Sequence, residues 1–87
     1  MEVLWDESKN ELLKKNRGVS FEMVVEKIAR HEFIGPEHNP ARPGQFRILV
    51  ELNEYPHVVP LVIDKNSDWF LKTTYPSRVE KRRFYHE

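Results

Sequence analysis

The chain has 87 residues, no cysteine, and 14 basic against 14 acidic side chains, so its formal net charge is zero. The absence of cysteine excludes disulfides, thiolate nucleophiles and zinc–thiolate sites, and the neutral sum gives no overall attraction to nucleic acid. No apolar run is long enough to cross a bilayer and the N-terminus lacks the pattern of a signal peptide, so we expect one cytoplasmic domain over residues 1–87 with no membrane partner.

Two helices are predicted in the N-terminal third. Asp6 is a candidate N-cap, and Gly18 is a natural residue to follow the end of a helix. Ser20 is the next candidate N-cap, and the i, i+3, i+4, i+7 spacing of one apolar face follows it at Phe21, Val24, Val25 and Ile28. We therefore expect an αα-hairpin of about 25 residues whose second helix lies on a sheet.

The segment from residue 31 to residue 44 is predicted to be a loop. The ten positions from Gly35 to Gly44 hold three prolines and two glycines, which favour turns. Phe33 and Ile34 are the part of this segment that could form a short edge strand. A loop of this length in so small a domain is typically either functional or mobile.

Three antiparallel strands are predicted after this loop. The first alternates apolar and polar positions from Phe46 to Leu52. The second, from His57 to Asp64, is a nearly continuous apolar run, in which Pro60 must lie at a bulge or where its missing donor faces outward. The third runs from about Trp69 to Thr74. Turn-forming residues between the strands indicate two hairpins.

The remaining elements complete the predicted fold. Pro76 is expected to break the strand, and Ser77 is a candidate cap for a last short helix from Val79 to Phe84. The sequence therefore predicts an α+β domain. Two N-terminal helices pack on an antiparallel sheet of three or four strands, and a short C-terminal helix follows.

Positive charge gathers near the C-terminus. From Lys72 onward there are five basic residues against two acidic ones, a local balance of +3. Outward positions of neighbouring strands and the start of the last helix can converge on one edge, where cations bind phosphates. This gives a candidate phosphate-contacting set of Arg47, Lys72, Arg78, Lys81 and Arg82. The same residues equally suit a solvated charged face that keeps a small domain soluble.

Tyrosines and histidines are the candidates for base stacking and proton transfer. Tyr75 and Tyr85 could stack on bases or donate a proton, or they could close the core. His57 and His38 are the imidazoles to consider as a general acid or base near neutral pH. The spacing of His31 and His38 fits no metal-ligand motif, so we expect no metal and no cofactor.

Two N-terminal motifs resemble a known family. Trp5-Asp6-x-x-Lys9-Asn10, followed by Gly18-Val19-Ser20-Phe21-Glu22, is similar to the opening of the BrnT toxins of bacterial type II toxin–antitoxin modules. This family belongs to the RelE-like superfamily. The similarity extends more weakly through Gly44-Gln45-Phe46, the hairpin strands and the closing basic helix with its tyrosine.

The resemblance implies a single RelE-like domain that cuts messenger RNA without a metal and is held inactive by a cognate antitoxin. Whether such cleavage needs the ribosome stays open. A ribose 2′-hydroxyl would attack the adjacent phosphate, which requires a base, an acid and cations that stabilise the charge on the phosphorane. For this chemistry we assign catalysis to Lys72, Tyr75, Arg78 and His57, and RNA binding to Arg47, Lys81 and Arg82.

The sequence departs from the family pattern in two places. The toxins usually show Lys-His-Gly before the second helix, where this chain has Asn16-Arg17-Gly18. They usually show Ser-Ala-Arg at the end of the last strand, and here either Tyr75 or Arg78 takes the place of that arginine. The missing histidine and the neutral charge favour an alternative, a non-catalytic protein-interaction module on the same scaffold.

Overall fold

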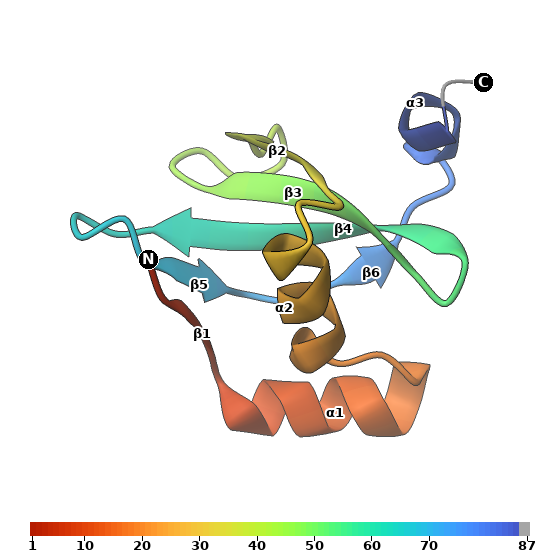
Figure 1. Ribbon diagram of the computed structural model, residues 1–87, viewed down its shortest axis with the longest axis horizontal. Helices are drawn as coiled ribbons and strands as arrows, with labels where there is room; N and C mark the ends of the chain where they lie inside the picture. The colour runs from red at the N-terminus through yellow and green to blue at the C-terminus, as the bar shows by residue number, and fades with distance from the viewer. Residues whose placement is uncertain (86–87) are drawn as a thin grey trace.

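The computed structural model of this protein describes residues 1–85. In chain order the elements are β1 (Val3–Trp5), α1 (Glu7–Arg17), α2 (Phe21–Ala29), β2 (Ile34–His38), β3 (Phe46–Leu52), β4 (Tyr55–Ile63), β5 (Trp69–Leu71), β6 (Tyr75–Pro76) and α3 (Lys81–Tyr85). Figure 1 shows α1 and α2 on one side of the sheet, and α3 at the end where β6 and the β3–β4 turn lie. The α+β class, the two N-terminal helices and the short C-terminal helix are confirmed.

The sheet is larger than predicted and is mixed. It has six strands in the order β1-β5-β4-β3-β2, with β6 paired to β4. β1 runs parallel to β5, with Val3 opposite Trp69 and Trp5 opposite Leu71, whereas every other pairing within residues 1–85 is antiparallel. The prediction of three or four antiparallel strands is therefore too low. Three residues are too few to show an alternating pattern, so β1 gives no strand signal in the sequence.

β2 corrects the prediction that residues 35–44 form a loop, and it includes Ile34, the second residue of the short edge strand that the sequence allowed. It pairs antiparallel with β3 at the edge of the sheet, and its register shifts part of the way along. An irregular edge strand is where proline is tolerated, as Pro36 is here. Gly35 has φ 110°, and a Cβ at this position would lie 2.8 Å from the backbone oxygen of Arg47. Only glycine fits between the two strands.

The β3–β4 hairpin is confirmed, and it explains where Pro60 can lie. Pro60 is buried in the middle of β4, opposite Arg47 of β3. Its carbonyl oxygen accepts from the backbone N–H of Lys72 at 2.9 Å, on the β5 side. The backbone N and O of one residue point to the same side of a strand, so the N of Pro60, which carries no hydrogen, also faces β5. The pairing of β4 with β5 ends at the next residue, Leu61, which lies opposite Leu71. The ladder to β3 is not interrupted.

The third predicted strand is shorter than expected, and Pro76 does not end the sheet. β5 stops at Leu71, and the chain rejoins β4 as β6, in which Tyr75 lies opposite Val58 and Pro76 opposite His57. The hydroxyl of the fully buried Thr74 donates to the carbonyl oxygen of Val58 at 3.1 Å. A side-chain hydrogen bond thus replaces ladder bonds between β5 and β6.

The predicted helix caps are confirmed. The Asp6 carboxylate accepts from the backbone N–H of Ser8 at 2.9 Å, and Gly18 ends α1 with φ 67°. The Ser20 hydroxyl accepts from the N–H of Met23 at 3.2 Å. Before α3, the Ser77 hydroxyl accepts from the N–H of Glu80 at 3.3 Å, although the helix starts two residues later than predicted.

The core lies between the two N-terminal helices and the sheet. It consists of Leu13, Val19, Phe21, Val24, Ile28, Ile48, Val50, Leu52, Val59, Leu61, Trp69 and Leu71. The fully buried Asn10 joins the helices, because its Oδ1 accepts from the N–H of Phe21 and its Nδ2 donates to Glu22, both at 2.8 Å. Within residues 1–85, no helix is both long enough and apolar enough to cross a membrane.

Candidate functional site

The sequence-predicted site residues fall into three groups. One residue, Arg47, belongs to a network of ion pairs. Three line two adjoining clefts, and these are Lys72, Tyr75 and His57. Three lie on α3 or just before it, outside the linings of both clefts, and these are Arg78, Lys81 and Arg82.

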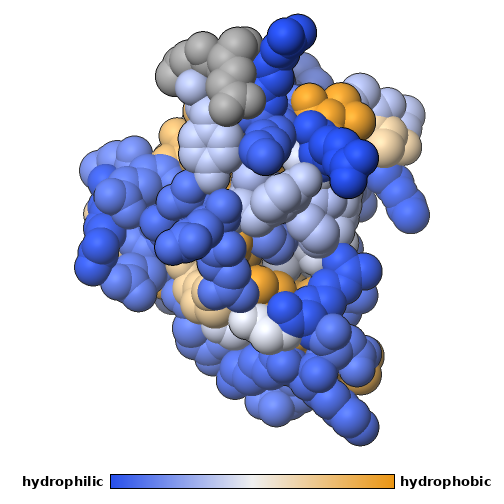
Figure 2. Space-filling model, turned by 90° about the vertical axis from the view of Figure 1, so that its right-hand side faces the viewer, coloured by the Kyte–Doolittle hydropathy of each residue, from blue (hydrophilic) through white to orange (hydrophobic). Residues whose placement is uncertain are grey.

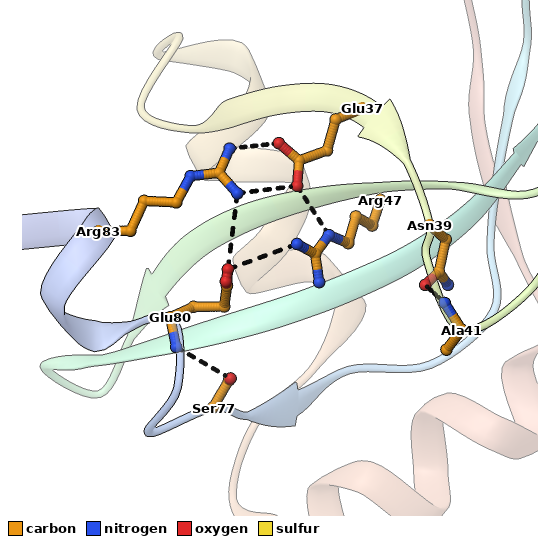
Figure 3. A network of polar contacts seen from close by, with 7 residues as sticks. All are labelled: Glu37, Asn39, Ala41, Arg47, Ser77, Glu80 and Arg83. Carbon is orange, nitrogen blue, oxygen red and sulfur yellow. Dashed lines mark hydrogen bonds and ion pairs between the residues drawn. The ribbon is translucent and has the colours of Figure 1, made fainter.

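Four charged side chains, Glu37, Arg47, Glu80 and Arg83, form what we call the ion-pair network (Figure 3). Arg47 Nε donates to Glu37 at 2.8 Å, and Arg47 Nη2 lies 3.4 Å from Glu80. Arg83 forms two hydrogen bonds to the Glu37 carboxylate, and its Nη1 lies 3.5 Å from Glu80. Two guanidinium groups thus meet two carboxylates, and the network has no net charge.

The ion-pair network serves the fold. Hydrogen bonds from Arg83, and then from Arg47, hold the pKa of Glu37 below its ordinary value of 4.5, against an opposing effect of burial. The Arg47 side chain is 15% exposed, so a phosphate could reach it only by displacing these carboxylates. The Tyr85 hydroxyl also donates to Glu51 on β3. These contacts hold α3 against β2 and β3.

A second region is a cleft that we call the loop cleft. It has a volume of about 330 Å³ and is lined by Asn39, Ala41, Arg42, Gln45, Pro60, Lys72, Thr73 and Tyr75. Residues 39–45 connect β2 to β3 and form one wall, while the chain between β5 and β6 forms the other. Tyr75 is 36% exposed, and Lys72 Nζ lies 5.2 Å from the ring centroid of Phe70.

The third region adjoins the loop cleft at Tyr75, and we call it the histidine cleft. It is an open depression of about 560 Å³ lined by Arg17, His57, Tyr75 and Pro76. Arg17 is the last residue of α1, and its Nη1 donates to the carbonyl oxygen of Thr74 at 3.4 Å. The end of the first helix and the β6 edge are thereby brought together.

His57 is poised as a neutral imidazole with a free acceptor. Its Nδ1 lies 2.8 Å from the carbonyl oxygen of Tyr55, and because a carbonyl can only accept, Nδ1 carries the proton. In the neutral ring Nε2 is then unprotonated. It has no hydrogen-bond partner within residues 1–85, and no buried polar side-chain atom there lacks a partner. Nε2 therefore faces solvent. Burial, and to a lesser degree the charge of Arg17, lowers the pKa of His57 below 6.5, against the effect of the Tyr55 hydrogen bond.

The two clefts share an electrostatic feature. Their linings include three cationic side chains, Arg17, Arg42 and Lys72, and no carboxylate. None of the three forms an ion pair with a carboxylate in the part of the chain that the structure describes. A further cleft beside α2 is different, because Glu26, Glu51 and Glu54 line it together with two cations. The loop cleft and the histidine cleft, which we call together the Tyr75 clefts, thus lack the carboxylates that line the cleft beside α2, as far as residues 1–85 are concerned.

The cations near α3 are arranged on the surface. Lys81 Nζ lies 5.7 Å from the ring centroid of Tyr55, while Arg78 and Arg82 are exposed and make no ion pair within residues 1–85. Figure 2 looks onto this end of the molecule and shows a mainly hydrophilic face with small, separate hydrophobic areas. These residues could extend a binding surface but do not build a cleft.

Two of the cations that line the clefts, Arg17 and Arg42, were outside the predicted set. Arg17 carries a signal in the sequence, since it stands where the family pattern has a histidine, whereas Arg42 carries none because it lies in the segment read as a loop. His38, the other candidate imidazole, stacks on Phe46 with centroids 4.9 Å apart. Across residues 1–85, no group of three or more histidines and carboxylates is placed to hold a metal ion.

Comparison with family models, with curated proteins and with solved structures finds no match to this chain. The geometry of the clefts and the resemblance of the N-terminal motifs are therefore the two grounds on which a function can be argued.

Proposed function

We propose that this chain is the toxin of a type II toxin–antitoxin pair and acts as a metal-independent ribonuclease at the clefts on either side of Tyr75. The observation that carries the proposal is the composition of these clefts. Arg17, Arg42 and Lys72 line them without any carboxylate, in a chain that has as many acidic as basic residues. Unneutralised cations beside an imidazole and a phenol suit a phosphodiester substrate.

The proposed reaction uses Arg17, His57 and Tyr75 of the histidine cleft together with Lys72 of the loop cleft. His57 Nε2 takes the proton of the ribose 2′-hydroxyl, and the 2′-oxygen attacks the adjacent phosphorus. Arg17 and Lys72 stabilise the negative charge that accumulates on the phosphorane. The bond from phosphorus to the 5′-oxygen then breaks, and the Tyr75 hydroxyl donates a proton to the leaving oxygen. The products are a 2′,3′-cyclic phosphate and a free 5′-hydroxyl.

The departures from the family pattern support this arrangement. Arg17 stands at the position of the family's histidine, and it lines the same cleft as His57. An imidazole thus enters the cleft from β4 instead of from the end of α1. Of the two candidates for the family's C-terminal arginine, Tyr75 lines both clefts and Arg78 lines neither. We therefore favour Tyr75, with the loop-cleft lysine supplying the positive charge.

The proposal is tested by inducing the chain alone in bacteria and mapping new RNA ends. We expect growth arrest and discrete cleavage, both lost in the double variant Arg17→Gln/Lys72→Gln. The matched control is Lys15→Gln/Lys65→Gln, which removes the same charge from exposed positions outside the clefts and should remain toxic. Normal growth and intact RNA with folded wild-type protein would refute the proposal, as would equal toxicity of the two double variants.

A second candidate function is the non-catalytic interaction module. The observation in its favour is that Leu4 and Phe70 lie opposite each other on β1 and β5 and are 41% and 38% exposed. Such a pair fits an apolar partner. If this is the function, the chain leaves growth and RNA unchanged but binds the product of an adjacent reading frame, and Phe70→Ser weakens that complex. A toxin would show the same complex, but it would also cut RNA when alone.

A further inference from the structure

The wall of the loop cleft is an ordered structure. The N–H of Asn39 donates to the carbonyl oxygen of Gln45 at 2.9 Å, and the N–H of Gln45 donates to that of Arg42 at 3.1 Å. The N–H of Arg42 donates in turn to the carbonyl oxygen of Asn39 at 3.2 Å. Residues 39–45 are thus closed on themselves by three backbone hydrogen bonds. The backbone of this loop is therefore held in place before any ligand arrives.

Asn39 is the unusual member of this wall. Its side chain is 6% exposed, and its Oδ1 accepts from the N–H of Ala41 at 3.0 Å (Figure 3). This contact fixes the amide plane, so Nδ2 is oriented as well. Nδ2 has no hydrogen-bond partner within residues 1–85, and Asn39 lines the loop cleft. Because no buried polar side-chain atom within residues 1–85 lacks a partner, Nδ2 is the solvent-accessible atom of this largely buried side chain. Its unused donor is ready to bind an acceptor.

The other groups of the loop cleft are of two kinds. Gln45, Thr73 and the Tyr75 ring are neutral, and between them they provide an amide, a hydroxyl and an aromatic face. Arg42 and Lys72 are cationic. A bare phosphate would need the cations alone, whereas a planar polar ring also uses the aromatic face and the fixed donor. The volume of about 330 Å³ lies within the range of small-ligand sites.

We propose that the loop cleft binds one unpaired nucleobase of single-stranded RNA. The base stacks on Tyr75, an acceptor on its edge receives the hydrogen bond of Asn39 Nδ2, and Lys72 or Arg42 contacts a phosphate next to it. This inference rests on the proposed ribonuclease function and makes the loop cleft its specificity site. The nucleotide held here determines which phosphate is presented to the histidine cleft on the other side of Tyr75.

The test measures binding of short single-stranded RNAs that are identical except at one central nucleotide. Four carry the four bases there, and a fifth carries a ribose without a base. We expect wild-type protein to bind its preferred base about 3- to 10-fold more tightly than bases without a matching acceptor, the size of one hydrogen bond, and at least about 10-fold more tightly than the abasic RNA, since stacking adds to it. Asn39→Ser should bind the four bases equally and still more tightly than the abasic RNA, because the stack on Tyr75 remains, while its affinity for the abasic RNA is unchanged.

The Asn39→Ser variant is chosen to spare the loop, because a serine hydroxyl can still accept from the N–H of Ala41. Asn66→Ser is the matched control: it changes an exposed asparagine in the β4–β5 turn and should keep the preference. If Asn39→Ser loosens the loop, Asn39→Asp retains the accepting oxygen and removes only the donor. That variant should bind the four base-containing RNAs equally, still more tightly than the abasic RNA because the stack on Tyr75 remains, and all five more weakly than wild type because of its added charge.

Two results would overturn the inference in distinguishable ways. Wild-type protein that binds all five RNAs with equal affinity, in a salt-dependent manner, contacts phosphates without reading a base. The inference would then fail and the proposed ribonuclease function would stand. If wild-type protein binds none of the RNAs, both the inference and the proposed ribonuclease function fail.

Discussion

The ion-pair network and the Tyr75 clefts both contain arginines, but the arginines have different surroundings. In the network every guanidinium meets a carboxylate, and Arg47 and Arg83 are fully balanced by Glu37 and Glu80. In the clefts Arg17, Arg42 and Lys72 form no ion pair with a carboxylate of residues 1–85. The pKa of Asp6 is lowered mainly by hydrogen bonds from Ser8, and the charge of Lys72 contributes to this only weakly. Although the net charge is zero, some cations are paired with carboxylates and others are not. The position of the carboxylates, more than the number of cations, indicates where an anionic ligand can bind.

The two regions also differ in what they do for the fold. The network joins α3 to β2 and β3, and its arginine on β3 is largely covered. Within residues 1–85 the side chains that line the clefts form no ion pair, and their cations reach another element only through the hydrogen bond of Arg17 to the chain before β6. Substitutions in the network should therefore act on stability, and substitutions in the clefts should act on RNA.

The largest expected effect is that of His57→Gln on cleavage. Loss of the general base should reduce the single-turnover rate on a short RNA by about 10²- to 10⁴-fold, while a side-chain amide can keep the hydrogen bond to Tyr55. Urea unfolding of the same variant shows whether the fold is retained. A folded variant that cleaves at the wild-type rate would remove His57 from the reaction.

The pH dependence of wild-type cleavage sharpens this assignment. A base must be unprotonated to act, so the rate should rise with pH and level off once His57 is neutral. Because burial lowers the pKa of His57, the midpoint of this rise should lie below the ordinary value of 6.5. The check is a rate profile measured over the acidic range. A midpoint above 6.5 would point to another group.

The next effect in size is that of Glu37→Gln on stability. Both arginines of the network lose their main acceptor, and Arg47 is left largely covered beside Glu80 alone. We expect the free energy of unfolding to fall by about 1–3 kcal/mol in urea titrations. The matched control is Glu26→Gln, which breaks an exposed pair with Arg30 and should cost only about 0.3–0.5 kcal/mol. Equal losses in both variants would contradict a structural role for the network.

Acid should reduce the difference in the free energy of unfolding between wild type and Glu37→Gln. The pKa of Glu37 is lowered in the folded state, so its contribution is fully present above the ordinary value of 4.5 and is lost as the pH falls through the folded-state pKa. Urea midpoints of the two proteins should therefore differ at neutral pH and converge well below pH 4.5. A difference that grows on acidification would mean that the carboxylate is not paired as described.

The smallest expected effect is on the salt dependence of RNA binding. Each phosphate contact to single-stranded RNA adds about −0.7 to the slope of log affinity against log salt concentration. Lys72→Gln should therefore make the slope shallower by about 0.7. Arg83→Gln, which removes an arginine already paired with Glu37, should leave it unchanged. The opposite pattern, measured by fluorescence anisotropy, would assign the phosphate contacts to the network.

Local signals were sufficient for part of the fold. Asp6, Ser20 and Gly18 predict the helix ends because capping depends on residues close in the chain. Strand alternation predicts β3 for the same reason. β1 was missed because it is three residues long and pairs with a strand far along the chain. β2 was anticipated only at Ile34, because the rest of it lies among prolines that only an irregular edge tolerates.

The candidate site was likewise predicted only in part from the sequence. Lys72, Tyr75 and His57 were selected for their chemistry and lie in the clefts. Arg47 was selected on the same ground, but its neutralisation depends on Glu37 and Glu80, which lie 10 and 33 residues away in the chain. Sequence spacing does not reveal such pairing. Asn39 gave no signal at all, because its role depends on burial.

The most direct test of the account is an NMR titration of isotope-labelled protein with a short single-stranded RNA, following the backbone and arginine side-chain signals. We predict that the shifts concentrate at Arg17, Lys72 and Tyr75, on both sides of β6, and that the Arg47 and Arg83 side-chain signals stay where they are. Shifts centred on Arg47 and Arg83 of the ion-pair network, with the clefts unaffected, would contradict the central claim that RNA binds at the clefts, where cations lack carboxylates.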